Sequence, residues 1–585
     1  MTNIPRNEYP RPQLVREDWI NLNGEWQFEI DNGRTGLSNI YHIFSKPEFC
    51  KYDFNHRDSL NDKIIVPFSP ESKLSGIGNT DFMDCVWYLK EFEIPSSQKG
   101  KRTIIHFGAV DYHAIVYVNK QPVGEHKGGY SSFSFDITDF LKDGKNTVTV
   151  CAIDDIRSTK QPSGKQSIYR ESEGCFYTRT TGIWQTVWLE FVPKNYIKNF
   201  KTVSDIENAG VNFDFKLSDY CVNSKLKITA FYNGKEVGNA ETSVEGMNTN
   251  VTVKLTEKHL WEVGNGELYD FTAVLTDENG TEDKITGYFG LRSVALTEKA
   301  FTLNGKKVFG RWVLDQGFYP DGIYTAPTDE ALKADIEYSM KLGFNGARLH
   351  EKIFEPRFLY WADKLGYLVW GEYPNWGVDI RNVSALEYIL PEWLEAMERD
   401  FAHPSIIGWC PMNETWDAYG GQQSNELLRI IYLATKAADT TRPVIDTSGN
   451  FHVVTDIYDV HDYSQDPKEF HEHYDNKYYE PHPLRQTRKG EPYFVSEYGG
   501  IQWSYKSGGD AWGYGNAPKT EEEFIERYRG LTEVLLKDEK MLGFCYTQLY
   551  DVEQEQNGLM TYDRQFKFDP EIFYKINAQK AKIEE

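Results

Sequence analysis

Hydrophobic and polar residues alternate in short segments over the first third of the chain. The clearest segments are KRTIIHFGAV (101–110), HAIVYVNK (113–120), SSFSFDIT (131–138) and NTVTVCAI (146–153). Alternation with a period of two, interrupted by Gly, Asn and Asp, predicts strands of an antiparallel sandwich. A hairpin that turns at Asn119–Lys120, followed by a Gly-Gly loop into the next strand, is typical of a jelly roll. We therefore predict a jelly-roll β-sandwich over residues 1–195, ending in the Trp-rich strand of RTTGIWQTVWLE (179–190).

The same rhythm continues on a smaller scale over residues 196–295, in GVNFDFKLS, SKLKITAFYNGKEV, NVTVKL and YDFTAVLTDENG. About a hundred residues of this kind predict one immunoglobulin-like β-sandwich. The titratable side chains of its strands form no cluster and cannot be distinguished from those on an ordinary solvated strand face. We interpret this domain as a spacer that fixes the angle between its neighbours.

From residue 296 onward the pattern changes to an apolar strand followed by an amphipathic helix. The strands are nearly continuous apolar runs, and helices such as ALKADIEYSMKLG repeat apolar residues at spacings of three and four. Repeated strand and helix units over residues 296–585 predict a (β/α)₈ TIM barrel. The eight predicted strand units are RWVLDQ (311–316), NGARLH (345–350), YLVWGEY (367–373), SIIGWCPMNE (405–414), PVIDTSG (443–449), IYDVHDY (457–463), PYFVSEYG (492–499) and LGFCYTQLYD (542–551).

Composition narrows the classes of partner. A net charge of −24 and a pI near 5.1 argue against nucleic acid and anionic membranes as partners. The aromatic content of 15% suits stacking on sugar rings, and it suits β-sandwich cores equally well. Seven widely spaced cysteines, no apolar leader at the start and no apolar run of transmembrane length predict a soluble cytoplasmic protein with reduced thiols. We also expect a homo-oligomer.

Two glutamates end predicted barrel strands. Glu414 follows Asn413 in GWCPMNET (408–415), and Glu497 closes the apolar run in PYFVSEYGG (492–500). Hydrolysis of a glycosidic bond needs one carboxyl to protonate the departing oxygen and a second to attack the anomeric carbon. Either glutamate alone is explained by a solvated loop, but the pair at strand ends favours an active site.

With these motifs the chain resembles glycoside hydrolase family 2. The resemblance rests on the domain order, NE at the fourth strand, SEYG at the seventh, DVEQEQNGLMTYDR (551–564) after the eighth, and the RTTGIWQTVWLE segment. That family contains exo-acting, retaining β-galactosidases, β-glucuronidases and β-mannosidases. The resemblance implies that Glu414 is the general acid/base and Glu497 the nucleophile, and a retaining pair lies about 5–5.5 Å apart. At that distance we expect the ionised nucleophile to keep Glu414 protonated.

Further site residues follow from the resemblance. Arg348 in GARLHEK would hold the nucleophile ionised by a charge-assisted hydrogen bond, and Asn413 would donate to the sugar 2-hydroxyl. His461 and Tyr463 lie where the family presents a tyrosine near the nucleophile, and either fits.

The other candidates have structural alternatives. Trp376 and Tyr546 are stacking platforms for the sugar or packed core aromatics, and Asp315 binds sugar hydroxyls or forms a salt bridge. RLHEKIFEP departs from the RxSHYP-like run of many family members, which leaves the part played by His350 open.

The predicted identity of the sugar depends on the absence of an Asn-x-Lys pair. The family's β-glucuronidases grip the substrate carboxylate with an Asn-x-Lys pair, and no such pair occurs between residues 497 and 585. An unpaired carboxylate in a closed pocket is costly, although Arg564 is a possible substitute. We therefore expect an exo-acting retaining β-glycosidase that hydrolyses a terminal β-D-galactoside, with a β-glucuronidase as the alternative. The rival from another class is a catalytically inactive carbohydrate-binding protein on the same scaffold.

No cofactor is expected. The sequence has no glycine-rich phosphate loop and no GxSxG motif. We interpret His471, Glu472 and His473 as surface charge, with a structural ion as the alternative, and predict no metal site.

The long segment 161–183 before the last strand of the first domain is expected to reach the barrel mouth, as a loop at this place does in the resembling family. A surface excursion is the alternative.

Overall fold

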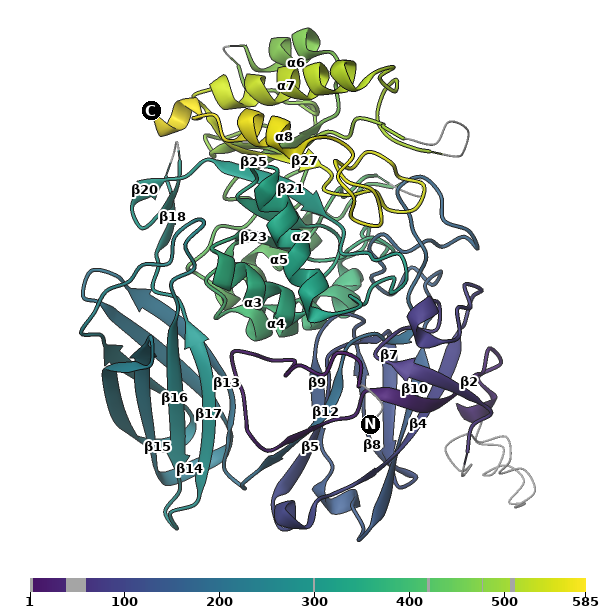
Figure 1. Cartoon of the computed structure of the whole chain (residues 1–585), viewed down its shortest axis with the longest axis vertical. Coiled ribbons are helices and arrows are strands. Elements are labelled where there is room, and N and C mark those ends of the chain that lie inside the picture. Colours follow the sequence, from purple (N-terminus) through teal and green to yellow (C-terminus); the bar gives the residue numbers. More distant parts are fainter. Residues whose placement is uncertain (1–3, 38–58, 298–299, 418–420, 476, 505–510) are drawn as a thin grey trace.

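The computed structural model describes residues 1–585 apart from 1–3, 38–58, 298–299, 418–420, 476 and 505–510. Two β-sandwiches lie side by side, and the barrel rests on both of them (Figure 1). The N-terminal segment runs between the sandwiches. Within it, Arg16 donates to Glu190 of the first sandwich at 2.8 Å and to Asp283 of the second at 2.9 Å, so one buried guanidinium joins the two domains.

The first sandwich has the jelly-roll layout that its alternating segments predict. A four-stranded sheet in the order β1-β12-β5-β9 faces a six-stranded sheet in the order β3-β2-β4-β10-β7-β8, with a small pair β11-β6. The turn between β7 and β8 places Asn119 and Lys120 at φ 50° and 69°, the left-handed pair that a two-residue hairpin requires. The strands are β1 (Trp19–Asn21), β2 (Gly24–Ile30), β3 (Asp62–Val66), β4 (Cys85–Glu93), β5 (Arg102–Phe107), β6 (Val110–Asp111), β7 (His113–Val118), β8 (Gln121–Lys127), β9 (Phe133–Asp136), β10 (Lys145–Ile153), β11 (Gly182–Ile183) and β12 (Val187–Val192).

The second sandwich is built around one long strand. β14 pairs with β13, β15 and β16, and two segments that the sequence pattern separates form this single strand of 23 residues. Register shifts in its pairing with β15 allow it to bend. The strands are β13 (Ile197–Asp205), β14 (Gly210–Tyr232), β15 (Lys235–Lys254), β16 (Tyr269–Thr276) and β17 (Glu282–Phe289).

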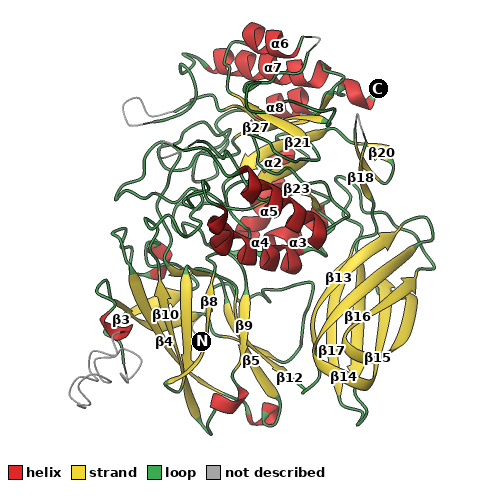
Figure 2. Ribbon diagram, turned by 180° about the vertical axis from the view of Figure 1, so that it is seen from behind, coloured by secondary structure: helices red, strands yellow, loops and turns green. Residues whose placement is uncertain are grey.

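The third domain is a curled parallel sheet in the order β24-β23-β22-β21-β27-β26-β25, surrounded by helices (Figure 2). Three short strands, β18 (Val294–Leu296), β19 (Phe301–Leu303) and β20 (Lys306–Lys307), precede it. The barrel strands are β21 (Gly310–Asp315), β22 (Gly346–Leu349), β23 (Leu368–Glu372), β24 (Ile406–Cys410), β25 (Tyr458–Asp462), β26 (Tyr493–Gly499) and β27 (Met541–Thr547). The helices are α2 (Asp329–Lys341), α3 (Pro356–Leu365), α4 (Leu386–Asp400), α5 (Asn425–Ala438), α6 (Pro467–Tyr474), α7 (Glu521–Lys537) and α8 (Pro570–Asn577).

Seven of the eight predicted strand units are strands, and the unit at 443–449 is not. It touches β24 and the segment after it only through the isolated parallel bridges Trp409–Val444 and Asn413–Ser448. The Asp446 carboxylate accepts from the backbone N–H groups of Thr447, Val453 and Val454 at 2.9, 2.7 and 3.0 Å. These local bonds satisfy the backbone in place of a regular ladder.

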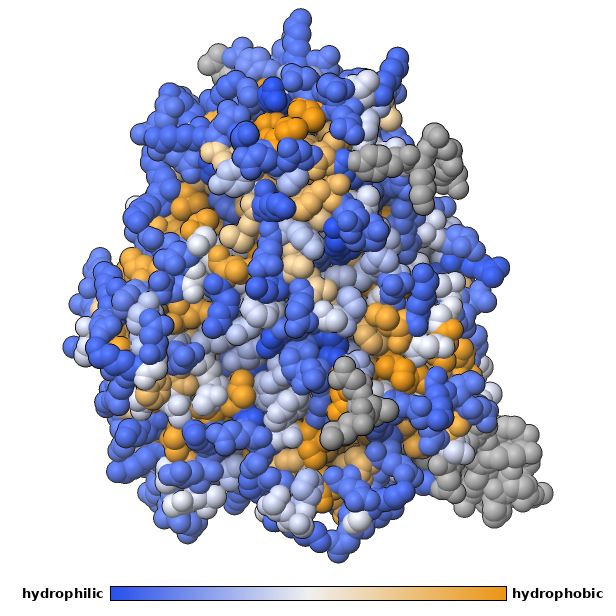
Figure 3. Space-filling model, viewed as in Figure 1, coloured by the Kyte–Doolittle hydropathy of each residue, from blue (hydrophilic) through white to orange (hydrophobic). Residues whose placement is uncertain are grey.

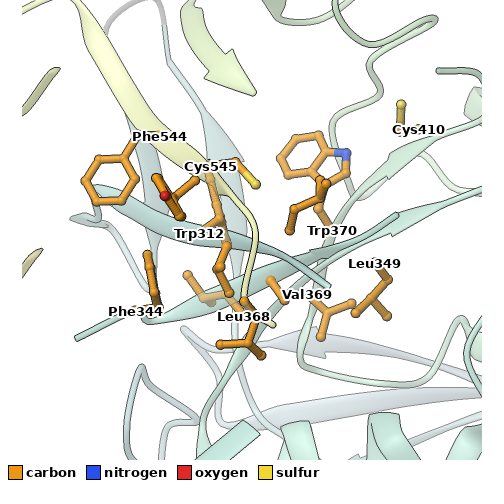
Figure 4. Packing of buried hydrophobic residues seen from close by; sticks show 14 of the residues in the cluster. Trp312, Phe344, Leu349, Leu368, Val369, Trp370, Cys410, Phe544 and Cys545 are labelled. Atoms are coloured by element: carbon orange, nitrogen blue, oxygen red, sulfur yellow. The ribbon is translucent and has the colours of Figure 1, made fainter. Parts of the chain in front are cut away.

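Large aromatic side chains fill the barrel interior below the strand ends. Trp312 of β21 packs edge-on against Trp370 of β23, with ring centroids 5.9 Å apart (Figure 4). It also packs edge-on against Phe494 of β26, with ring centroids 4.9 Å apart. Glycine makes room for the indole, because a Cβ on Gly346 would lie 2.6 Å from Trp312. The interior is therefore closed by packing, and polar chemistry is confined to the carboxyl ends of the strands.

The outer surface is mainly hydrophilic, with scattered apolar patches on the face drawn in Figure 3. Among the described residues, no helix combines the length and the apolarity that crossing a membrane requires.

Candidate active site

Arg348 of β22 lies at the centre of a cluster at the strand ends and is only 2% exposed. Its Nε donates to Glu372 Oε2 at 2.6 Å, its Nη1 to Glu497 Oε1 at 2.7 Å and its Nη2 to Asn413 Oδ1 at 2.6 Å. Burial disfavours the charged guanidinium, but the charges of Glu372 and Glu497 outweigh burial and raise the pKa of Arg348 well above its usual value. A permanent cation therefore holds three strand ends together.

Glu414 and Glu497 face each other across this cluster. A carboxylate oxygen of each and a ring nitrogen of His461 all lie within 4.8 Å of one another. His461 Nδ1 is 2.7 Å from Glu414 Oε1, and its Nε2 is 3.4 Å from Glu497 Oε1. The Tyr463 hydroxyl donates to Glu497 Oε2. Of the two residues left open by the sequence, Tyr463 is thus the tyrosine beside Glu497, and His461 links the two glutamates.

The backbone at Glu414 is left-handed, with φ 41°. A non-glycine residue pays on the order of 1 kcal/mol for this conformation. The Glu414 N–H donates to Ser448 O at 2.9 Å, so the irregular segment at 443–449 holds the residue in place.

The protonation of the pair differs from the expectation that Glu414 is held protonated. Burial would raise the pKa of Glu414, but the hydrogen bond to His461 and the charges of His461 and Lys165 outweigh burial and lower it. Burial also disfavours the His461 imidazolium, yet the Glu497 charge and the Glu414 hydrogen bond raise the pKa of His461 above 6.5. The contact between the two side chains therefore lowers the pKa of the Glu414 carboxyl and raises the pKa of the His461 imidazole.

Replacement of His461 by Asn is expected to move the alkaline limb of the kcat/KM against pH profile to lower pH. The physical reason is that a proton shared by two sites is lost at a higher pH than a proton held by Glu414 alone. The measurement is the pH dependence of aryl glycoside hydrolysis, with exposed His471→Asn on α6 as the matched control. An unchanged limb in the His461 variant would remove this residue from the proton balance.

Asn413 offers one unused donor to the site. Its Oδ1 accepts from Arg348, and its backbone is clamped by Asn375, which accepts from the Asn413 N–H at 2.5 Å and donates to the Asn413 carbonyl at 3.1 Å. Among the described residues the buried Nδ2 of Asn413 has no partner. This geometry suits the predicted donation to a sugar 2-hydroxyl.

Trp376 and His350 also belong to the cluster. Trp376 Nε1 donates to the Asn413 carbonyl at 3.2 Å, and one face of its ring is covered by Lys165, whose Nζ lies 3.9 Å from the ring centroid. His350 Nδ1 lies 2.9 Å from Glu372 Oε1. Burial and the nearby positive charges, first that of Lys165, lower the pKa of His350 well below its usual value, so its ring is neutral.

Asp315 lies outside this cluster. Its carboxylate accepts from Gly317 N at 2.9 Å and from the Tyr550 hydroxyl. Because Trp312 of the same strand points into the barrel interior, a residue three positions later faces the other side. Burial and the charge of Asp335 raise the pKa of Asp315 to about 6.

The interpretation of Tyr546 as a stacking platform is wrong. Its ring packs in the core against Tyr528 of α7 and Tyr498 of β26, with centroids 4.8 and 5.6 Å away. Strand alternation explains this placement, because the next residue, Thr547, faces the site and lies 3.2 Å from the Tyr463 hydroxyl.

Arg564, the possible partner for a sugar carboxylate, forms an ion pair with Asp335 instead. It donates to both carboxylate oxygens of Asp335 on α2, at 3.0 and 3.1 Å, and its guanidinium lies 3.5 Å from the centroid of the Tyr550 ring. A substrate carboxylate would have to displace this ion pair.

The segment expected to reach the barrel mouth docks there. Ser163 N donates to Trp376 O at 2.7 Å, and Gln554 Nε2 donates to Phe176 O at 2.9 Å. The Tyr177 hydroxyl donates to Glu555. The first domain therefore contributes side chains to the cluster in the third.

Three residues of the cluster were missed by the sequence interpretation. Glu372 ends the strand of YLVWGEY, so the rule that found Glu414 and Glu497 could have found it. Tyr514 stacks on Tyr463 with ring centroids 3.4 Å apart, and Lys165 comes from the docked loop. For these two, no local sequence signal marks the contact.

In the described part of the chain, the group with metal-ligand spacing is Glu414, His461 and Glu497. In this group His461 Nδ1 lies 2.7 Å from Glu414 Oε1 and its Nε2 lies 3.4 Å from Glu497 Oε1. Of the HxH cluster on α6, His473 bonds Asp462 at 2.8 Å and stacks on Tyr479 at 4.2 Å.

Three family models match the chain in succession. They describe the sugar binding domain of glycosyl hydrolases family 2 over residues 20–193, a second domain of glycosyl hydrolases family 2 over 195–292 and the TIM barrel domain of that family over 294–567. The chain belongs to glycoside hydrolase family 2. Its three-domain fold and its barrel are those of the family.

Relatives in glycoside hydrolase family 2 carry two kinds of name. A β-galactosidase of Thermoanaerobacter pseudethanolicus is 27% identical over 423 residues, which are 68% of this chain and 52% of the relative. A putative β-glucuronidase of Formosa agariphila is 27% identical over 347 residues, 56% of this chain and 40% of the relative. This chain thus spans about half the length of these two proteins. A β-glucuronidase of Streptococcus agalactiae is 24% identical over 416 residues, 65% of this chain and 67% of the relative.

Solved structures of β-glucuronidases share the fold over nearly all of the chain. A β-glucuronidase from an uncultured Clostridium superposes with a TM-score of 0.77 at 22% identity, covering 96% of this chain and 98% of its own. The β-glucuronidase of Lactobacillus rhamnosus has a TM-score of 0.78 at 20% identity, with 97% and 98% covered. At such identities the likeness concerns the fold and not the sugar.

Proposed function

We propose that this family 2 protein is an exo-acting, retaining β-glycosidase in which Glu497 is the nucleophile and Glu414 the general acid/base. The observation that carries the proposal is the pair of carboxylates whose oxygens lie within 4.8 Å at opposed strand ends. Carboxyls this close leave no room for a water on the far side of the sugar, which an inverting reaction would need.

The reaction has two displacements. In the first, Glu497 attacks the anomeric carbon while Glu414 protonates the glycosidic oxygen, so that the aglycone leaves and a covalent glycosyl-enzyme forms. His461 Nδ1 lies 2.7 Å from Glu414 Oε1 and is placed to exchange a proton with it for this step. In the second, Glu414 takes a proton from water, the water oxygen attacks the anomeric carbon, and Glu497 departs as a carboxylate. Arg348 and Tyr463 stabilise that carboxylate through their hydrogen bonds.

The docked loop supports exo action. Residues of the loop between β10 and β11 cover one side of the strand ends and bond to Trp376 and Gln554. A closed end admits one terminal sugar and excludes the middle of a long chain.

For the sugar we propose a terminal β-D-galactoside. Arg564 is already paired with Asp335, and the chain after residue 497 has no Asn-x-Lys pair, so these two means of holding a uronic carboxylate are lacking. A β-glucuronidase is the alternative, because relatives of both names match the chain. An inactive binding protein is disfavoured, since two carboxylates aimed at one bond serve no purpose in binding.

Turnover of p-nitrophenyl β-glycosides of galactose, glucuronic acid, glucose and mannose at neutral pH tests the proposal, with the product anomer followed by NMR. The expected result is the highest kcat/KM on the galactoside and a β-configured product. Inactivity on all four sugars would refute the β-glycosidase proposal, whereas an α-configured product would refute the retaining mechanism.

A further inference from the structure

Lys165 is a buried cation in the proposed active site. It lies in the loop between β10 and β11, and only 6% of the residue is exposed. Its Nζ lies over the Trp376 ring, 3.9 Å from the centroid, and the same indole donates to the Asn413 carbonyl next to Glu414. Among the described residues, Lys165 Nζ has neither an ion pair nor a hydrogen bond.

The backbone beside Lys165 is fixed against the barrel. Gly164 has φ 54°, and a Cβ there would lie 2.2 Å from the Glu351 carbonyl oxygen, so only glycine allows this approach. On its other side Ser163 N donates to Trp376 O at 2.7 Å. The backbone that carries Lys165 is therefore held against the barrel, and the Trp376 ring lies under its ammonium group.

Lys165 stays charged in this setting. Burial disfavours the ammonium, but the charges of Cys175, Glu555, Glu414 and Glu497 outweigh burial and raise its pKa. Because burial raises the pKa of the Cys175 thiol as well, the carboxylates supply this effect at neutral pH. An ammonium has three donors, and no hydrogen bond within the described residues uses those of Lys165, so they are free for an acceptor on a ligand that enters the site.

We infer that Lys165 is a specificity-determining residue, which donates a hydrogen bond to a hydroxyl group of the terminal sugar. This inference rests on the proposed function. A hydroxyl accepts from the ammonium without adding charge, whereas a carboxylate on the sugar would enter beside Glu414, Glu497 and Glu555. The first domain then contributes to recognition of the sugar, in addition to closing the site.

The test uses Lys165→Met, which removes the charge and keeps the length of the side chain. Exposed Lys160→Met in the same loop is the matched control. The substrates are p-nitrophenyl β-D-galactoside and its 3-, 4- and 6-deoxy analogues. Lys165→Met is expected to lower kcat/KM on the parent galactoside by about 10- to 100-fold, with the control unchanged. For one deoxy analogue, the kcat/KM of the wild type should be lower than its kcat/KM for the parent galactoside by a similar factor. The kcat/KM of Lys165→Met should be no lower for that analogue than for the parent.

Other outcomes overturn the inference. An equal loss on the parent and on all three analogues would mean that Lys165 acts through the charges of the glutamates and not through a sugar hydroxyl. A loss confined to p-nitrophenyl β-D-glucuronide would mean that it binds a carboxylate. Melting temperatures separate these results from misfolding. A second variant, Lys165→Gln, keeps an amide donor and should lose less kcat/KM than Lys165→Met. If the wild type cleaves none of the aryl glycosides, the proposed function fails. If the wild type is active and Lys165→Met has the same kcat/KM as the wild type, only the assignment of Lys165 fails.

Discussion

Glu497→Ala is expected to abolish turnover of every glycoside, with kcat reduced on the order of 10⁴-fold or more. The reason is that Glu497 is the carboxylate that lies opposite Glu414, within 4.8 Å of it, so its removal takes away the group placed to form the covalent intermediate. The measurement is kcat on an aryl glycoside, with Glu526→Ala, an exposed glutamate on α7, as the control for the same chemical change.

Azide distinguishes loss of the nucleophile from loss of the fold. The alanine leaves a space in which azide can attack the anomeric carbon from the face opposite the aglycone. The expected product is an α-glycosyl azide. A Glu497 variant that keeps more than a small fraction of wild-type kcat without azide would show that the nucleophile is another residue.

Glu414→Ala is expected to discriminate between leaving groups. Protonation matters in proportion to the basicity of the departing oxygen, so alkyl glycosides should lose about 10²- to 10⁴-fold in kcat/KM, while dinitrophenyl glycosides keep measurable glycosylation. The two substrates are compared on the same protein, which makes each the control for the other.

Azide gives a second readout for this variant. Glu497 still forms the glycosyl-enzyme, so azide attacks from the aglycone side and should give a β-glycosyl azide, the opposite anomer to that of the Glu497 variant. Equal losses on both leaving groups would remove Glu414 from the acid role.

Sequence periodicity was sufficient for the fold, because each domain repeats one pattern many times. The segment at 443–449 is the instructive exception. Its apolar residues resemble a strand, but Asp446 bonds nearby backbone groups and replaces the ladder. In β14, two apparent strands are one, because a bulge bends the chain without breaking its pairing.

The site was predictable where strand ends define it and obscure elsewhere. Glu414, Glu497, Arg348 and Asn413 come together because parallel strands present their carboxyl ends at one rim. Tyr546 was misjudged because its side of the strand depends on a register that spacing alone does not fix. Lys165 reaches the cluster from another domain, and no local pattern reports a contact over such a separation in sequence.

The docking of the loop at Trp376 affects how the activity should respond to heat. Lys165 is carried by one domain and the two glutamates by another, so the complete site lasts only while the interface between them holds. Interfaces between domains open at a lower free-energy cost than packed cores. Heat should therefore inactivate the protein before the barrel melts, and the half-life of activity and the melting temperature of the barrel become separate quantities. Engineering for durability would then gain more from bonds such as Ser163 to Trp376 and Gln554 to Phe176 than from a tighter barrel core.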